Sequence, residues 1–145
     1  MYNMYLIQET DEETLVLKIP ELPDDIEIKG SYDNKKSNVL NLGEIIRVGK
    51  KNLESFTLKS FFPASDADVY VKIFNKMLEN MSEKQYPIRY ILNRTDGLKL
   101  YDDINMLVVC DDYSYKESGG EVGDIYYTFK FTQYKEHKAR VIGSV

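Results

Sequence analysis

Apolar and polar residues alternate along the last third of the chain. In residues 125–134, Ile125, Tyr127, Phe129 and Phe131 alternate with polar or half-polar neighbours, which is the period of a strand with one buried face. Residues 105–110 form a second apolar run, and residues 111–124 join the two as a polar segment with three glycines. The pattern predicts two strands connected by a long glycine-containing loop.

The middle of the chain has helical periodicity instead. Six large apolar residues recur at intervals of three and four on one predicted helix face: Tyr70, Ile73, Phe74, Met77, Leu78 and Met81. Ser65 is placed to cap this helix, with Asp68 three residues later. We therefore predict an amphipathic helix at about 65–82. Packing on the chain's own core is the main interpretation, and filling a partner's groove is the alternative.

Shorter apolar runs predict further strands before and after the helix, at residues 2–7, 14–19, 26–29, 53–62 and 88–93. Residues 39–40 and 44–48 flank an Asn-Leu-Gly break at 41–43. The acidic residues 9–13 form the predicted tip of the first hairpin, and residues 95–97 form another turn. Six or so strands with one helix predict an α+β fold of mostly antiparallel strands, as a sandwich or partly open barrel. Its 145 residues fit one domain spanning 1–145.

Charge and hydropathy exclude several function classes. The net charge is −5 and no basic cluster is present, so binding to nucleic-acid phosphates is not expected. No apolar run approaches the roughly 20 residues that cross a bilayer. The N-terminus lacks the basic and apolar regions of a secretory signal. We expect a chain that is made and folded in the cytoplasm and takes no nucleic-acid or membrane partner.

The titratable residues do not form an expected catalytic or metal site. Cys110 is the single cysteine and lies in an apolar run, whereas the single histidine, His137, lies in a charged segment, so we predict a buried thiol rather than a nucleophile. The paired carboxylates at 102–103 and 111–112 flank a predicted strand about 23 Å long by strand rise, too far apart to share one bond. The glycines at 119–123 lack the Gly-Lys-Ser/Thr of a phosphate loop. We expect no enzyme activity, no cofactor and no metal.

An ordered series of motifs resembles one protein family. They are residues 34–45 (NKKSNVLNLGEI), 53–63 (LESFTLKSFFP), 87–95 (PIRYILNRT), 104–108 (INMLV), 113–117 (YSYKE) and 123–135 (GDIYYTFKFTQYK). Together, over residues 24–136, the chain is similar to the N-terminal module of tail proteins from PBSX-type prophages. Those proteins usually carry a peptidoglycan-binding LysM domain after this module. Residues 1–145 contain no LysM sequence, so we expect the structural module alone.

The resemblance implies a structural component of a contractile phage tail or phage-tail-like bacteriocin, placed in the baseplate. It implies partners among tube, hub, wedge or sheath-initiating proteins, several copies in a ring, and a location in the bacterial host cytoplasm before incorporation into the particle. It transfers no catalytic residue. Candidate assembly contacts are the residues Tyr2, Tyr5, Tyr113, Tyr115, Gly119, Gly120 and Gly123, although the tyrosines could equally cover the chain's own sheet. Two rival functions stay open: an adaptor that binds a cell-wall glycan or peptide, and a small hydrolase with an unrecognised carboxylate pair.

Overall fold

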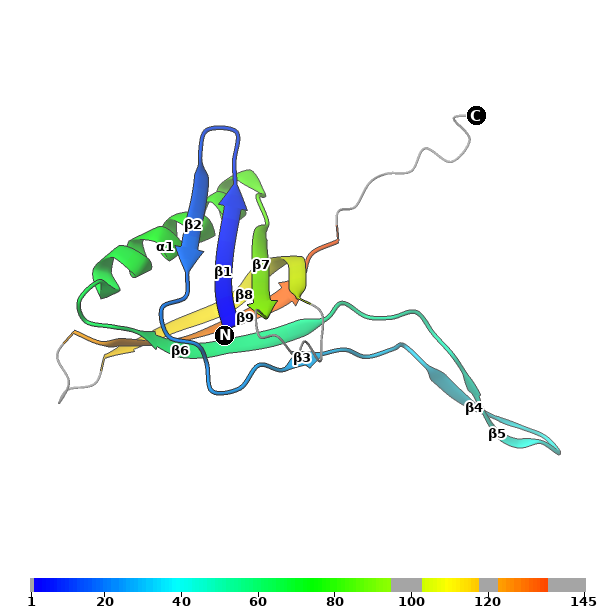
Figure 1. Cartoon of the computed structure of the whole chain (residues 1–145). Helices are drawn as coiled ribbons and strands as arrows, with labels where there is room; N and C mark the ends of the chain where they lie inside the picture. Colours follow the sequence, from blue (N-terminus) through cyan, green and yellow to red (C-terminus); the bar gives the residue numbers. More distant parts are fainter. Residues whose placement is uncertain (1, 95–102, 118–122, 136–145) are drawn as a thin grey trace, which may run out of the picture.

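The computed structural model describes residues 2–94, 103–117 and 123–135. Within them the chain forms nine strands and one helix (Figure 1). In chain order the elements are β1 (Tyr2–Glu9), β2 (Thr14–Lys18), β3 (Ile28–Lys29), β4 (Lys35–Val39), β5 (Gly43–Arg47), β6 (Ser55–Phe62), α1 (Ala67–Lys84), β7 (Ile88–Arg94), β8 (Ile104–Glu117) and β9 (Ile125–Gln133). The predicted α+β class is confirmed.

Seven of the strands form one antiparallel sheet in the order β2-β1-β7-β8-β9-β6-β3, whereas β4 and β5 pair only with each other. The large sheet curls instead of lying flat. The rings of Phe56 on β6 and Tyr90 on β7 pack with centroids 4.5 Å apart, although β8 and β9 separate these strands in the sheet. The described strands therefore form a strongly curved sheet that does not close into a barrel.

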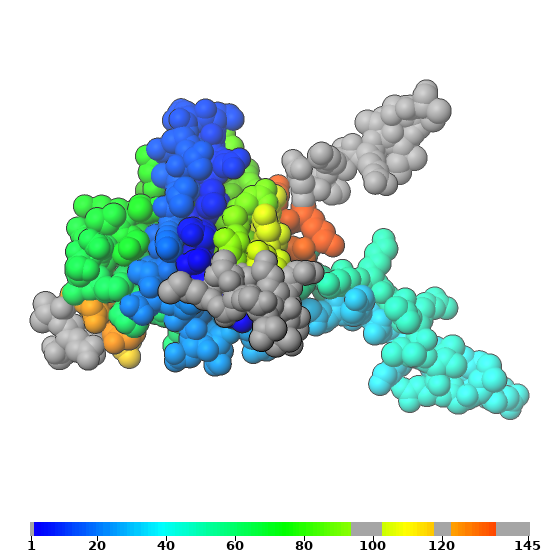
Figure 2. All heavy atoms as spheres, in the orientation of Figure 1, coloured from blue at the N-terminus to red at the C-terminus, as the bar shows by residue number. Residues whose placement is uncertain are grey.

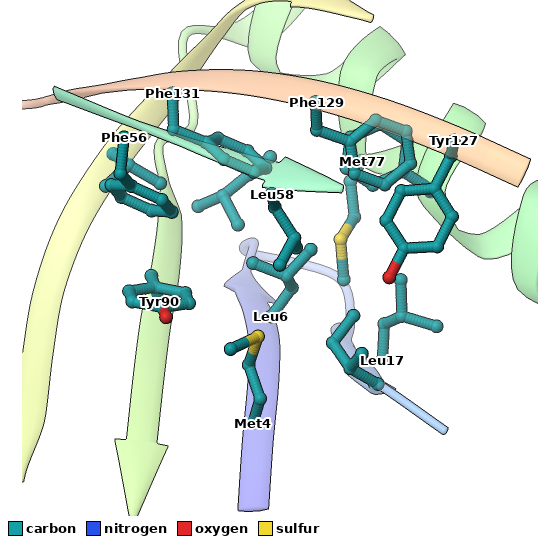
Figure 3. Packing of buried hydrophobic residues seen from close by; sticks show 14 of the residues in the cluster. Met4, Leu6, Leu17, Phe56, Leu58, Met77, Tyr90, Tyr127, Phe129 and Phe131 are labelled. Carbon is teal, nitrogen blue, oxygen red and sulfur yellow. The ribbon is translucent and has the colours of Figure 1, made fainter. Parts of the chain in front are cut away.

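The core fills the concave side of this sheet (Figure 3). It includes Met4 and Leu6 from β1, Leu17 from β2, and Phe129 and Phe131 from β9, all essentially inaccessible to solvent. The alternation seen in residues 125–131 thus places its apolar positions inside, as a half-buried strand requires. Burial of each such side chain contributes about 1.5–3 kcal/mol.

The helix α1 covers the open part of the core. It spans Ala67–Lys84, two residues later than predicted at each end. Ser65 does not cap it: the N-cap is Asp66, whose side chain makes no capping hydrogen bond. Phe74 stacks on Phe129 with ring centroids 3.9 Å apart. The apolar stripe is therefore core packing, as its main interpretation held.

The prediction of a loop over 111–124 is wrong in its first half. Strand β8 continues to Glu117, with a bulge between Cys110 and Asp112. Tyr113 and Tyr115 pair directly with Phe129 and Tyr127 of β9. The polar residues of this segment occupy the exposed side of the sheet, and a bulge inserts one residue without ending the pairing. Within the described residues, no helix has the length and apolar character needed to cross a bilayer.

Candidate interaction surface

The arm, defined as residues 30–52, projects away from the rest of the molecule (Figures 1 and 2). It consists of β4, β5 and the two segments that join them to β3 and β6. Two main-chain hydrogen bonds hold these segments together, from Asp33 to the Lys50 carbonyl at 2.9 Å and from Asn52 to the Ser31 carbonyl at 2.8 Å. The arm is therefore a continuous two-stranded ribbon.

Glycine permits the close approach of the two segments at Gly49. Its N–H donates to the side-chain oxygen of Asn34 at 2.9 Å. A Cβ atom at position 49 would lie 1.6 Å from the Asp33 carbonyl oxygen, inside its van der Waals radius. At the tip, Asn41 and Gly43 take positive φ values of 73° and 78°, which these residue types tolerate in a tight hairpin turn. Local sequence thus explains both the turn and the ribbon.

The arm exposes a set of aliphatic side chains. Leu40 is 90% exposed, Leu42 74% and Val48 78%, and Ile45 and Ile46 on β5 are also exposed. Every residue of β5 is exposed and none of β4 is buried. A lone two-stranded ribbon is marginally stable in water, and clustered exposed apolar side chains mark interaction surfaces. The arm has the features of a surface that another protein covers.

The arm also differs in charge from the rest of the chain. It carries five Lys or Arg and two Asp or Glu, a net charge of +3, so the remaining residues carry −8 of the total of −5. Lys35 lies directly opposite Arg47 across the ribbon, an arrangement of like charges that destabilises a strand pair. Among the described residues neither cation forms an ion pair, whereas Lys36 contacts Glu44 at 3.9 Å on the other face. Lys35 and Arg47 are available to carboxylates of a partner.

The structure brings two of the predicted contact residues together: the rings of Tyr113 and Tyr115 on β8 pack edge-on with centroids 5.7 Å apart. Tyr2 lies exposed at the start of β1, and Tyr5 is half-buried beneath the Lys18 ammonium, 6.0 Å from its ring centre. Tyr113 is 50% exposed on β8. Gly119 and Gly120 lie outside the described residues.

Tyr115 and Gly123 have structural roles within the chain. Tyr115 packs edge-on against Phe129 at 5.9 Å and donates its hydroxyl proton to Asn75 on α1 at 3.1 Å. Burial raises the pKa of the Tyr115 phenol above its usual range. Gly123 has φ +104°, and a Cβ there would lie 2.6 Å from that of Ala64. These contacts lie within the chain, and a role of the two residues in assembly stays a prediction.

A groove of about 1280 Å³ runs along the outer face of β6 and β9 beside residues 22–27. Phe61 and Tyr126 pack together in it with ring centroids 5.5 Å apart. Four carboxylates and four lysines also line it: Asp24, Asp25, Glu27 and Asp111 with Lys29, Lys59, Lys116 and Lys130. The described residues contain no cluster of three or more His, Cys, Asp or Glu that could hold a metal ion. The groove offers aromatic and polar contacts. Because its positive and negative side chains are equal in number, it is neither an acidic nor a basic site.

Sequence reasoning missed the arm as a surface. The sequence did contain a signal for an exposed surface. Residues 39–48 are rich in aliphatic side chains around an Asn-Leu-Gly turn, and lysines lie on both sides of them, at 35–36 and 50–51. These residues do not alternate with period 2, because Leu40 and Leu42 belong to the turn and Ile45 and Ile46 are adjacent. Without alternation, the run could not be assigned to a buried or an exposed face.

Comparisons with known proteins come from both sequence and structure. No protein-family model matches the chain. It is 24% identical over 149 residues to the uncharacterized protein YqbP of Bacillus subtilis (strain 168), and the match covers 98% of this chain. The chain spans 63% of the length of YqbP.

Two solved structures match this chain in the structure comparison. One is a chain of the anti-feeding prophage baseplate, determined by cryo-EM with six-fold symmetry imposed, with a TM-score of 0.60 and 8% sequence identity. The match covers 92% of this chain and 89% of that one. The other belongs to the SPP1 tail tube, with a TM-score of 0.48, 15% identity, and coverage of 90% and 73%. The curved sheet with its single helix is therefore a fold that this chain shares with a component of a prophage baseplate.

Proposed function

We propose that this chain is a non-enzymatic structural component of the baseplate of a contractile phage tail or phage-tail-like particle. In this role it connects the tube or hub to surrounding baseplate proteins. The fold shared with the anti-feeding prophage baseplate over nearly the whole chain supports the proposal. The resemblance of residues 24–136 to the N-terminal module of PBSX-type tail proteins supports it independently.

The observation that carries the proposal is the exposed arm. Hiding one leucine side chain from water contributes about 1.5–3 kcal/mol, and the described structure leaves Leu40 and Leu42 almost entirely in solvent. Such an exposed apolar projection is typical of an interaction site, and it would give an assembly subunit a contact that is formed only in the particle. We infer that the arm is buried against a neighbouring tail protein.

Complementation in a producing strain tests this role. The gene that encodes this chain is deleted from the producing strain, and a copy that encodes the double variant Leu40→Ser with Leu42→Ser is supplied. The two substitutions remove the apolar tip of the arm and change no buried residue. We expect folded protein in the lysate, no contractile particles by negative-stain electron microscopy, and no chain in sedimented material. Val69→Ser is the matched control, since Val69 is an exposed aliphatic residue on α1.

Two results would contradict the proposal. Particles of normal number and activity from the arm variant would show that the exposed leucines are not assembly contacts. Complete tails whose density map lacks this chain, seen in the wild-type strain, would remove the baseplate assignment itself. If the density map of complete tails does contain this chain, the map would also identify the neighbours of the arm.

A cell-wall adaptor is the second candidate, and the groove is the observation that favours it. Its Phe61–Tyr126 pair lies among threonine, aspartate and lysine side chains, and aromatic rings with polar neighbours suit sugars and peptides. Co-sedimentation of the purified chain with peptidoglycan, lost in Phe61→Ser, would support this function. Release of soluble fragments in the same assay would instead support the hydrolase interpretation and would overturn the non-enzymatic proposal.

A further inference from the structure

Strand β2 is the terminal strand at one end of the large sheet, with α1 packed beside it. The Ile19 N–H donates to the Met4 carbonyl and the Thr10 N–H to the Glu13 carbonyl, each at 2.9 Å. Hydrogen-bonded pairs recur at every second position of an antiparallel ladder, so Leu17 and Leu15 also bond to β1. The main-chain groups of the alternate residues, Thr14, Val16 and Lys18, therefore point away from the sheet. Among the described residues no main-chain hydrogen bond reaches these groups.

The two strands of the arm differ in how they protect their edges. Strand β4 carries Lys35 and Lys36, and lysines on an edge strand are a common defence against unwanted pairing. Strand β5 carries Ile45 and Ile46, both exposed, with a single cation at Arg47. Strands β2 and β5 have the same length of five residues. The edge of β5 is thus the one suited to pairing. Its two isoleucines are adjacent and point to opposite faces, so one of them would lie on the same face as Val16, which is itself 50% exposed.

Charge favours the same combination. Residues 9–18, which contain β2 and its preceding turn, hold four carboxylates and one lysine, a net charge of −3. The arm carries +3. Glu13 already contacts Lys76 at 3.3 Å, while within the described residues Asp11 and Glu12 form no ion pair. These two carboxylates are free to approach Lys35 and Arg47 of another copy.

The two surfaces lie at opposite ends of the sheet. The arm leaves the sheet between β3 and β6, and β2 forms the other margin. In Figures 1 and 2 the arm and the β1–β2 hairpin project from different sides of the molecule. The ribbon from Tyr32 to Leu40 measures about 30 Å by strand rise, enough to lie across a neighbouring copy. Complementary patches at two different places give a head-to-tail contact, which closes into a ring if the rotation permits.

We propose that β5 of one copy pairs with the β2 edge of a second copy, so that copies of this chain join head to tail. This inference rests on the proposed function in one respect, since it names the partner of the same arm. Main-chain hydrogen bonds supply the contact, one isoleucine of β5 packs beside Val16, and the acidic turn before β2 faces the cations of the arm.

A proline at position 16 tests the edge directly. The Val16 N–H points away from β1, so Val16→Pro keeps the β1–β2 ladder while it removes the outward donor. The matched control is Val16→Thr, which keeps the donor and a β-branched side chain. We expect the wild type and Val16→Thr to form a finite oligomer at low ionic strength by sedimentation velocity, and Val16→Pro to sediment as a folded monomer. Circular dichroism confirms the fold of each variant.

A charge exchange tests the pairing of the two surfaces. One variant carries Lys35→Glu with Arg47→Glu on the arm, and the other carries Asp11→Lys with Glu12→Lys on the turn. Each alone places like charges at every contact, so each should remain monomeric. In an equal mixture every contact between unlike copies again joins opposite charges, and the oligomer should return. Raised salt should weaken the wild-type oligomer.

Three outcomes would overturn the inference. They are a wild-type chain that stays monomeric at its solubility limit, a Val16→Pro oligomer equal to that of the wild type, and a mixture of charge variants that fails to associate. None of these outcomes removes the proposed function, because an arm that binds a different tail protein would still be required for particles in the complementation assay. Conversely, a chain that forms the expected ring but is absent from tails would refute only the proposed function.

Discussion

The side-chain amide of Gln8 on β1 donates a hydrogen bond to the main-chain carbonyl of Met77 on α1 at 2.9 Å. The same amide nitrogen lies 3.2 Å from the Tyr86 carbonyl, and the amide oxygen accepts from Asn80 at 3.1 Å. Gln8 is fully buried. One polar side chain thus joins the first strand to the last turns of the helix, and every one of its polar atoms is used.

Replacing Gln8 should therefore lower the free energy of unfolding by more than the size of its side chain suggests. In Gln8→Leu the Tyr86 carbonyl and the Asn80 amide lose their partner, so we expect the free energy of unfolding to fall by about 1–3 kcal/mol. Urea unfolding followed by circular dichroism measures it. Asn80→Ala completes a double-mutant cycle, in which residues of one network should show non-additive losses. Strictly additive effects would show that the two side chains do not act together.

Gly49→Ala should disrupt the arm without destabilising the core. A Cβ at this position would collide with the Asp33 carbonyl, whereas the arm buries none of its strand residues. Compared with the wild type, we expect an unchanged urea midpoint but faster hydrogen exchange of the main-chain amides at positions 33 and 49. Gly30→Ala is the control, since its Cβ would lie 3.8 Å from the nearest atom of Lys51. Equal exchange in both variants would contradict the geometry at the base of the arm.

Tyr127→Phe should be neutral or stabilising by about 1 kcal/mol. The Tyr127 hydroxyl is buried and no partner for it is found within the described residues. Ser60 lies opposite Tyr127 on β6 and donates its own hydroxyl proton to the Glu21 carbonyl at 2.7 Å. Removing an unsatisfied buried group removes its desolvation penalty. Tyr115→Phe is the contrasting variant, which should lose about 0.5–1.5 kcal/mol with its bond to Asn75. Thermal unfolding of both variants measures the two changes in stability. A clear loss of stability in Tyr127→Phe would show that the Tyr127 hydroxyl has a hydrogen-bond partner.

Cys110 should react slowly below strongly alkaline pH. Burial raises the pKa of its thiol to about 11, and the carboxylates of Asp111 and Asp112 act in the same direction. Because the folded pKa exceeds the unfolded value of about 8.5, the protonated thiol favours the native state, and this stabilisation is lost as pH rises from about 8.5 through 11. The rate of iodoacetamide labelling, followed by mass spectrometry, should rise over that range. The thiol is half-buried and not fully buried as predicted. Rapid labelling of native protein at pH 8 would contradict the raised pKa.

Removing Leu42 should leave the fold intact, unlike removing Leu58. Leu42→Ser replaces a side chain that is mostly in water, so we expect a change within about 0.5 kcal/mol. Leu58→Ala creates a cavity at a buried position of β6 and should cost about 2–5 kcal/mol. Urea unfolding of the two variants makes the comparison. A large loss in Leu42→Ser would mean that the tip packs on the body and is not a free surface.

Elements with one strong period were predictable. The stripe from Tyr70 to Met81 predicted the helix within two residues, because its apolar spacing is unusual for any other structure. The alternation from Ile125 to Phe131 likewise predicted β9 and the residues that it buries. The extension of β8 past Cys110 was not predictable, because Asp111–Glu117 is polar enough for a loop. It became a strand because β9 offers partners along its length.

The candidate site was less accessible to sequence reasoning. The sequence left two alternatives for Tyr115, a contact with a partner protein and packing on the chain's own sheet. Only its packing against Phe129 in the structure assigned it to the core. The arm was overlooked because aliphatic residues predict burial in general. Whether Leu40 and Leu42 are buried depends on what lies near them in space, which a local pattern does not contain.

Sequence alone determined the secondary structure with clear periodicity and the α+β class. These properties depend on neighbouring residues and on composition. The tertiary structure decided which apolar side chains the core hides. Among residues 2–94, 103–117 and 123–135 it gave the outward main-chain groups of β2 no hydrogen-bond partner and left the arm exposed. Burial and edge exposure depend on contacts between residues far apart in the chain, and such contacts exist only after the sheet has curled.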